Sequence, residues 1–156
     1  MNHLYKLLPP QGVLVDCPAS DKDAALDAVA ALFAPACGVP VARIRASLAA
    51  REELGSTGLG QGVAIPHGRL RGIREALAAV VRLRAPVPYD APDGRPVGLL
   101  IALLVPESAS QQHLELLSEL AQMLSDRPMR EALMEAPGAD ALRARVGSWE
   151  PVRPAA

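Results

Sequence analysis

The sequence has few aromatic residues, few lysines and no run of basic residues. Phe, Trp and Tyr make up 3% of the 156 residues, which is too few for an aromatic platform that stacks on nucleic-acid bases. The 16 Lys and Arg residues are balanced by 17 Asp and Glu residues, and the net charge is −1. This balance gives no electrostatic reason to expect a nucleic-acid partner.

Cysteines, metal-ligand motifs and long apolar runs are also scarce. Cys17 and Cys37 fit neither a disulfide framework nor zinc-ligand spacing, and the histidines lack metal-site spacing, so we expect no metal and no other cofactor. The longest apolar run, "VGLLIALLVP", is about half of the ~20 residues that a membrane-spanning helix needs. The first residues lack the apolar core of a signal peptide. We therefore expect a cytoplasmic protein without membrane insertion.

Short apolar stretches alternate along the chain with stretches of helical periodicity. Strands are predicted at 12–17, 62–67, 76–86 and 96–106. Helices are predicted at 21–37 with Ser20 as N-cap, at 39–54, from Ser108 onward, at 127–136 and at 138–147. The helix after Ser108 carries an apolar stripe of Leu114, Leu117, Leu120, Ala121 and Leu124.

The apolar strands lack a polar face and therefore need cover on both sides of their sheet. This pattern predicts an α/β fold, a three-layer α/β/α domain with a small sheet. An Asp-Gly turn at 93–94 joins two of the strands as a hairpin, so the sheet is expected to be mixed. We expect one domain over residues 1–150 and a flexible, proline-rich tail over 151–156.

The glycine-rich segment "GSTGLGQGVAIPHGRL" (55–70) is the most unusual stretch of the sequence. It has no lysine for a nucleotide P-loop, and Val63 replaces the third glycine of a dinucleotide fingerprint. Its backbone N–H groups can still converge on an anion, because glycines adopt positive φ without steric cost. The hydroxyls of Ser56 and Thr57 and the planar guanidinium of Arg51 are candidate additional donors.

Two histidines are candidates for chemistry. His67 is expected to end the strand at 62–67, with Pro66 restricting the backbone and Gly68 allowing close approach from outside. A neutral imidazole can accept a phosphoryl group on one nitrogen while a backbone carbonyl holds the other N–H. His113 is expected in the first helical turn, where the helix dipole favours its neutral form. The competing interpretations are a turn histidine and a packed surface histidine without chemical roles.

Two stretches together resemble a known family. "REELGSTGLGQGVAIPHGRL" (51–70) and "LLIALLVPESASQQHLELLSELAQML" (99–124) are similar to the enzyme IIA proteins of the bacterial phosphotransferase system, in the fructose/mannitol group. The resemblance covers nearly the whole chain, and it is strongest to the stand-alone, nitrogen-regulatory members. It implies a three-layer fold with a mixed sheet.

The resemblance also implies the roles of site residues. His67 would be the phosphorylated residue, as a tele-phosphohistidine, and Arg51, His113, Ser56 and Thr57 would stabilise the phosphate. The phosphoryl donor would be an HPr-like histidine phosphocarrier that docks over His67. We expect an apolar rim for this docking, formed by Leu59, Val63 and Leu70.

Three functions remain open from the sequence. The first is a regulator whose phosphorylation toggles binding to targets such as a potassium transporter or a sensor kinase. The second is a relay that passes phosphate to a sugar-specific IIB protein. The third is a hydrolase with His67 as general base and Ser56 or Thr57 as nucleophile, which lacks an evident orienting carboxylate. The absence of a IIB or membrane segment in the sequence favours the regulator.

Overall fold

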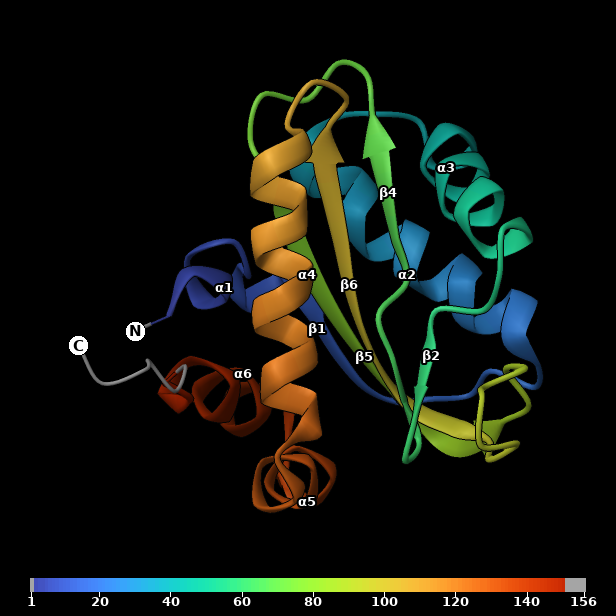
Figure 1. Ribbon diagram of the computed structural model, residues 1–156, viewed down its shortest axis with the longest axis vertical. Coiled ribbons are helices and arrows are strands. Elements are labelled where there is room, and N and C mark those ends of the chain that lie inside the picture. Colours follow the sequence, from blue (N-terminus) through green and yellow to red (C-terminus); the bar gives the residue numbers. More distant parts are fainter. Residues whose placement is uncertain (1, 151–156) are drawn as a thin grey trace.

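In the computed structural model, which describes residues 2–150, six strands form one mixed sheet (Figure 1). The order is β1-β5-β6-β3-β2, and β4 also pairs with β6. The strands are β1 (Val13–Cys17), β2 (Gly58–Gly60), β3 (Val63–Ala64), β4 (His67–Leu70), β5 (Leu77–Val87) and β6 (Val97–Pro106). The tail predicted at 151–156 lies outside the described residues.

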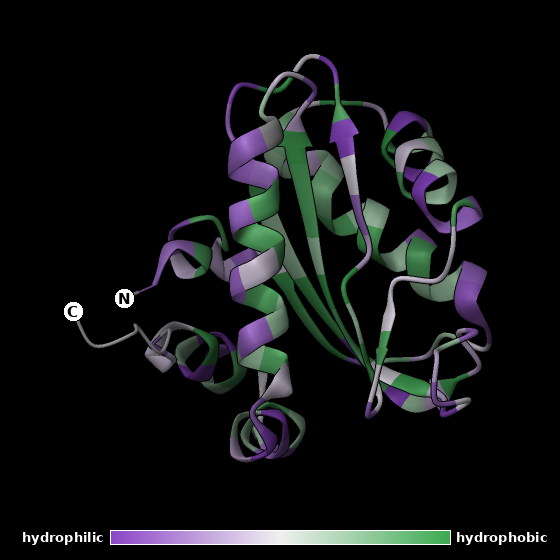
Figure 2. Cartoon of the chain, viewed as in Figure 1, coloured by the Kyte–Doolittle hydropathy of each residue, from purple (hydrophilic) through white to green (hydrophobic). Residues whose placement is uncertain are grey.

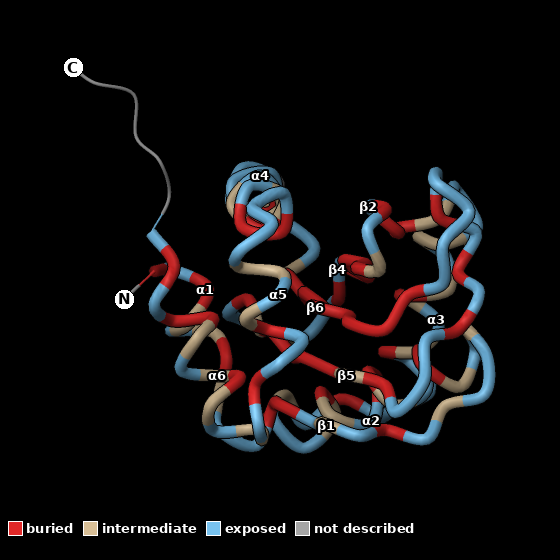
Figure 3. Tube along the Cα trace, turned by 90° about the horizontal axis from the view of Figure 1, so that it is seen from below, coloured by how far each residue is buried: buried red, intermediate tan, exposed pale blue. Residues whose placement is uncertain are grey.

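Helices cover both faces of this sheet (Figures 1 and 3). One layer is α2 (Lys22–Cys37) and α3 (Val41–Glu53). The other layer is α1 (His3–Lys6), α4 (Ser110–Ser125), α5 (Arg127–Glu135) and α6 (Ala139–Ser148), and the 3-10 turn η1 (Pro10–Gly12) precedes β1. None of the helices within residues 2–150 combines the length and the hydrophobicity that a membrane span requires.

The central strand β6 explains why two layers are needed. All its residues from Val97 to Val105 are buried, and Figure 2 shows β6 in green, the colour of hydrophobic residues, along most of its length. Leu99, Ile101 and Leu103 join a core with α4, α5 and α6, whereas Leu100 and Leu104 join a second core with α2 and α3. Successive residues of a strand point to opposite faces, so an apolar strand requires cover on both. The predicted three-layer α/β/α fold is confirmed.

The predicted hairpin is also confirmed, because β5 and β6 pair in antiparallel fashion. β1 runs parallel to β5, and both β3 and β4 run parallel to β6. The mixed character of the sheet therefore comes from the hairpin and from the antiparallel pair of β2 with β3.

The strand predicted at 62–67 is in fact two strands. β3 ends at Ala64 and β4 begins at His67, and both stay in register with β6. Pro66 has no N–H to give to the sheet, although its carbonyl still accepts from the N–H of Leu103 at 3.0 Å. His67 therefore begins a strand instead of ending one, and the interruption leaves the carbonyl of Ile65 free for another donor.

Two details of the helices differ from the prediction. The N-cap of α2 is Asp21 instead of Ser20, and its carboxylate accepts from the N–H of Ala24 at 2.7 Å. Leu114 on α4 is 62% exposed, so the buried face of this helix is rotated about the helix axis relative to the predicted apolar stripe. The α4 residues packed in the core are Leu116, Leu120, Met123 and Leu124.

Candidate functional site

His67 lies at the break between β3 and β4, and its side chain is buried. Its Nδ1 is 2.7 Å from the carbonyl oxygen of Ile65. A carbonyl oxygen only accepts hydrogen bonds, so Nδ1 carries the proton and Nε2 carries the lone pair. The strand break thus holds the imidazole in one tautomer with Nε2 directed away from the backbone.

Arg51, in the last turn of α3, reaches this Nε2 atom. Its Nε donates to Nε2 of His67 at 3.2 Å, and its Nη1 donates to the carbonyl of Gly55 at 2.9 Å. Burial lowers the pKa of His67 below its ordinary value of 6.5, and the charge of Arg51 lowers it further, while the Ile65 hydrogen bond opposes the shift. His67 is therefore neutral at pH 7, and its Nε2 lone pair accepts the hydrogen bond from Arg51.

His113, in the first turn of α4, lies beside His67. The two ring centroids are 5.1 Å apart and the rings meet edge to face at 66°. Arg69 on β4 donates from Nε to Nδ1 of His113 at 3.4 Å, so the proton of His113 is on Nε2. That Nε2 is buried and has no hydrogen-bond partner among the side chains and backbone groups that the structure describes. Burial, then the nearby His67, Arg69 and Arg51, lowers the pKa of His113.

The glycine-rich loop is held by hydroxyl groups that we expected to contact phosphate. The hydroxyl of Ser56 donates to the carbonyl of Tyr89 at 2.6 Å and accepts from the N–H of Gly58 at 3.1 Å. The hydroxyl of Thr57 is bonded to the carboxylate of Glu52. Both hydroxyl groups already have acceptors within the protein, so they shape the loop, and direct donation to a phosphate requires these bonds to break.

Glu52 is a residue of this region that the sequence analysis did not single out, although it follows Arg51 directly. Its side chain is 7% exposed and pairs with Lys22 at 2.8 Å. It also accepts from the N–H of Thr57 at 3.1 Å and from the hydroxyl of Tyr89 at 3.4 Å. Burial, followed by the charge of Glu52, raises the pKa of Tyr89. The buried carboxylate of Glu52 thus links the glycine-rich loop to α3 by hydrogen bonds, next to Arg51.

Three neighbours of His67 have roles other than those expected. Val63 is 1% exposed and Leu70 is 3% exposed, because each packs into one of the two cores. They cannot form a docking rim, and only Leu59 of the predicted three is exposed, at 40%. A Cβ at Gly68 would collide with the side chain of Ser47, so this glycine lets α3 pack closely on β4.

The site therefore combines two neutral histidines with two arginines. The lone pair of His67 Nε2 and the N–H of His113 Nε2 are directed by neighbouring groups, and Arg51 and Arg69 supply positive charge. No group of three His, Cys, Asp or Glu side chains within 2–150 is arranged to hold a metal ion. The chemistry available is nucleophilic attack by an imidazole on an anionic electrophile.

Comparison with known proteins identifies the class. Residues 6–147 match the family model described as "Phosphoenolpyruvate-dependent sugar phosphotransferase system, EIIA 2", so the chain belongs to this family. Among curated relatives, the chain is 47% identical over 143 residues to the "Nitrogen regulatory protein" of Pseudomonas aeruginosa, covering 91% of this chain and 93% of the relative. It is also 34% identical over 116 residues to the "PTS system fructose-specific EIIA component" of Haloferax volcanii, covering 74% and 63%.

Solved structures of enzyme IIA proteins have the same fold as this chain. The "Nitrogen Regulatory Protein IIA-Ntr" of Neisseria meningitidis superimposes with a TM-score of 0.89 at 43% identity, covering 93% of this chain and 99% of that one. Mannitol enzyme IIA of Escherichia coli, in a complex with phosphorylated enzyme IIB, superimposes with a TM-score of 0.76 at 16% identity, covering 92% and 100%. The second likeness shows the fold alone.

Proposed function

We propose that this protein is a phosphohistidine carrier in which His67 Nε2 takes a phosphoryl group from an HPr-like histidine phosphocarrier in the cytoplasm. The observation that carries the proposal is the hydrogen bond from Nδ1 of His67 to the carbonyl of Ile65 at 2.7 Å. It leaves Nε2 as the nucleophilic nitrogen, in a ring whose pKa is lowered by burial. Membership of the EIIA family supports the same reaction.

The transfer requires one bond to form and one to break. The lone pair of His67 Nε2 attacks phosphorus, and the N–P bond of the carrier breaks with its electron pair left on the carrier's imidazole. The proton on Nδ1 stays in place, held by Ile65. The transition state is loose, with charge on the equatorial oxygens, so catalysis depends on alignment and on donors directed at that charge.

Arg51 and His113 are the proposed donors. In the free protein Nε of Arg51 bonds the lone pair of His67 Nε2, so this donor must shift to the phosphoryl oxygens during transfer. Nε2–H of His113 has no partner among the described residues, and the ring centroids of His113 and His67 are 5.1 Å apart. Arg69 is a proposed positioning residue, because its bond to Nδ1 keeps the proton of His113 on Nε2.

We propose that the main role is regulatory, with the phosphorylation state of His67 controlling binding to targets such as a potassium transporter or a sensor kinase. The similarity to the nitrogen regulatory proteins of Pseudomonas aeruginosa and Neisseria meningitidis favours this role. Phosphorylation would add close to two negative charges to a site of neutral histidines, which changes what can dock there.

A relay to a sugar-specific IIB protein is the second candidate. The likeness to a fructose-specific EIIA component supports it. The hydrolase is less favoured, because His67 bonds Ile65 and Arg51, while the hydroxyls of Ser56 and Thr57 bond Tyr89 and Glu52.

The test of the carrier role is phosphorylation with phosphoenolpyruvate, enzyme I and an HPr-like carrier, followed by mapping of the label. One acid-labile phosphoryl group on His67 is expected, and none on a His67→Ala variant. Undiminished acid-labile labelling of His67→Ala would refute the assignment.

The regulatory role needs a second experiment. Free and phosphorylated wild-type protein are each used to capture partners from cell extract, with His67→Ala as a control that cannot be phosphorylated. We expect a partner that binds the free form and the variant but not the phosphorylated form. Rapid loss of the phosphate to a soluble IIB protein, with no partner that distinguishes the forms, would instead establish the relay.

A further inference from the structure

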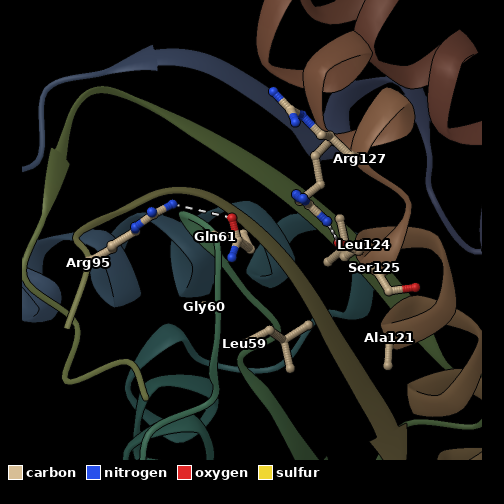
Figure 4. Close-up of a pocket in the computed structure, with 9 residues that line it drawn as sticks. Leu59, Gly60, Gln61, Arg95, Ala121, Leu124, Ser125 and Arg127 are labelled. Carbon is tan, nitrogen blue, oxygen red and sulfur yellow. Dashed lines mark hydrogen bonds between the residues drawn. The ribbon is translucent and has the colours of Figure 1, made fainter. Parts of the chain in front are cut away.

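A cavity of about 790 Å³ opens between the β2–β3 hairpin and the junction of α4 with α5 (Figure 4). It draws residues from three separate parts of the sequence. The lining residues are Leu59, Gly60, Gln61, Arg95, Ala121, Leu124, Ser125, Arg127 and Arg130. Pockets for small molecules typically have roughly 300–1,000 Å³, so the cavity has the size of a ligand site.

The cavity is separate from the site of phosphoryl transfer. His67, Arg51 and His113 are not among its lining residues. His113 lies in the first turn of α4, and the lining residue of that helix nearest to it is Ala121, eight residues further on, or roughly 12 Å along the helix axis at ~1.5 Å per residue.

The polar part of the lining is cationic. Arg95, Arg127 and Arg130 contribute guanidinium groups, and no lining residue carries a carboxylate. Arg130 donates to the carbonyl of Leu124 at 2.9 Å, and Arg127, whose side chain is 80% exposed, pairs with Glu131 at 3.0 Å. Each guanidinium has five N–H donors in a planar fork, so these bonds leave donors for a ligand. Such forks match the oxygens of phosphate groups.

One wall of the cavity is held in an unusual backbone conformation. Gln61 has φ of 58°, a region that residues other than glycine rarely adopt. Its N–H donates to the carboxylate of Asp93 at 2.8 Å. Its side-chain oxygen accepts from Nη1 of Arg95 at 3.2 Å, the bond that is dashed between Arg95 and Gln61 in Figure 4. These bonds orient Gln61 and Arg95 together, so this part of the cavity is preorganised.

We infer that this cavity binds a small organic anion bearing two or more phosphate groups. The phosphates would bond the guanidinium groups of Arg95, Arg127 and Arg130. The organic part would lie on the apolar lining formed by Leu59 and Ala121. Leu59 is 40% exposed, and a ligand there would cover it.

The test is titration of the full chain with pyrophosphate and with ADP, followed by calorimetry and by amide chemical shifts. Both probes should bind saturably and shift the amides of Gly60, Gln61 and Arg95. Arg95→Gln and Arg127→Gln should each weaken both probes by about tenfold or more, the loss expected for a charge-assisted hydrogen bond. ADP should bind more tightly than pyrophosphate, and Leu59→Ser should remove that advantage.

Two control variants separate this site from other anion effects. Arg84→Gln removes an arginine whose side chain is 62% exposed, close to the 65% of Arg95; Arg84 pairs with Asp16 at 3.1 Å and does not line the cavity, so this variant should leave both affinities unchanged. His67→Ala should also bind both probes as the wild type does. The inference is overturned if neither probe saturates, if the cavity variants bind like Arg84→Gln, or if His67→Ala abolishes binding. Equal affinities for ADP and pyrophosphate would refute the apolar half of the site.

Discussion

Replacing Arg51 with lysine keeps the positive charge near His67 but removes the planar fork. The guanidinium makes two bonds at once, from Nε to His67 Nε2 at 3.2 Å and from Nη1 to the Gly55 carbonyl at 2.9 Å. An ammonium group is a single point charge on a flexible chain and cannot reproduce both bonds with fixed geometry. In Arg51→Lys, the N–H donor that should bond the phosphoryl oxygens during transfer is therefore no longer held in a fixed orientation.

The expected loss follows from the number of donors removed. One preorganised donor to a developing oxyanion contributes about 100-fold to 1,000-fold in rate, or about 3–4 kcal/mol, so Arg51→Lys should slow phosphoryl transfer by that factor. The folding cost is smaller, because partly buried hydrogen bonds contribute about 1 kcal/mol each. Arg51→Lys should therefore slow phosphoryl transfer strongly while it lowers the free energy of unfolding only slightly.

The pH profile distinguishes charge from geometry. The charge of Arg51 contributes to the lowered pKa of His67. Arg51→Ala removes that contribution, so the pH at which transfer becomes half-maximal should move upward toward 6.5, the ordinary value for histidine. Arg51→Lys keeps the charge, so the midpoint should stay close to that of the wild type while the plateau rate falls.

The assay is rapid-quench transfer from the phosphorylated carrier between pH 5 and 8, alongside thermal unfolding. Arg43→Lys is the matched control, since Arg43 lies on the same helix and donates to the carbonyl of Arg71 at 2.9 Å. It should transfer at the wild-type rate. The reasoning fails if folded Arg51→Lys also transfers at that rate, or if Arg43→Lys loses as much.

Three further predictions follow from the site. His67 and His113 both have lowered pKa values, so the folded state binds fewer protons than the unfolded state near and below pH 6.5. The free energy of unfolding should therefore be highest above pH 6.5, the ordinary pKa of histidine, and should decrease as the pH falls below it. Denaturant unfolding of the wild type and of His67→Ala should show a smaller decrease in the variant. Arg69→Gln should slow transfer and change the imidazole nitrogen chemical shifts of His113, while Arg69→Lys should restore part of the rate; unchanged shifts in Arg69→Gln would contradict the positioning role. Gly68→Ala should lower the free energy of unfolding by about 1–3 kcal/mol, measured in urea, because its Cβ meets Ser47; unchanged stability would show that α3 can move away from β4.

Local patterns predicted most of the architecture. The apolar run at 96–106 predicts an interior strand because its residues suit a sheet covered on both faces, and β6 spans Val97–Pro106. The Asp-Gly turn predicts the hairpin with β5. The helix predicted at 21–37 ends at Cys37, and the next residue, Gly38, has φ of 70°, a conformation that glycine adopts without steric cost. These features depend on interactions within a few residues, so the sequence alone determines them.

The tertiary structure decided which side chains the site can use. Val63 and Leu70 flank His67 in sequence, but packing against the helices buries both. The hydroxyls of Ser56 and Thr57 follow Arg51 in the motif, but their partners are Tyr89 and Glu52. Sequence spacing reports neither burial nor hydrogen-bond partners, because both depend on segments that are distant along the chain.

The two histidines show most clearly what the sequence predicts and what the tertiary structure determines. Each motif indicated a reactive residue, and their similarity to one family implied a shared pocket. The sheet then brings β4 beside the end of β6, and α4, which follows that strand, places His113 at 5.1 Å from His67 by ring centroids. Arg69, which no sequence pattern indicated, donates to Nδ1 of His113 and so keeps the proton of that ring on Nε2. The strand break at Pro66 leaves the Ile65 carbonyl free to accept from Nδ1 of His67, which keeps the proton of that ring on Nδ1. The sequence alone determined which residues carry the chemistry, whereas long-range packing determined which nitrogen of each ring is free to act.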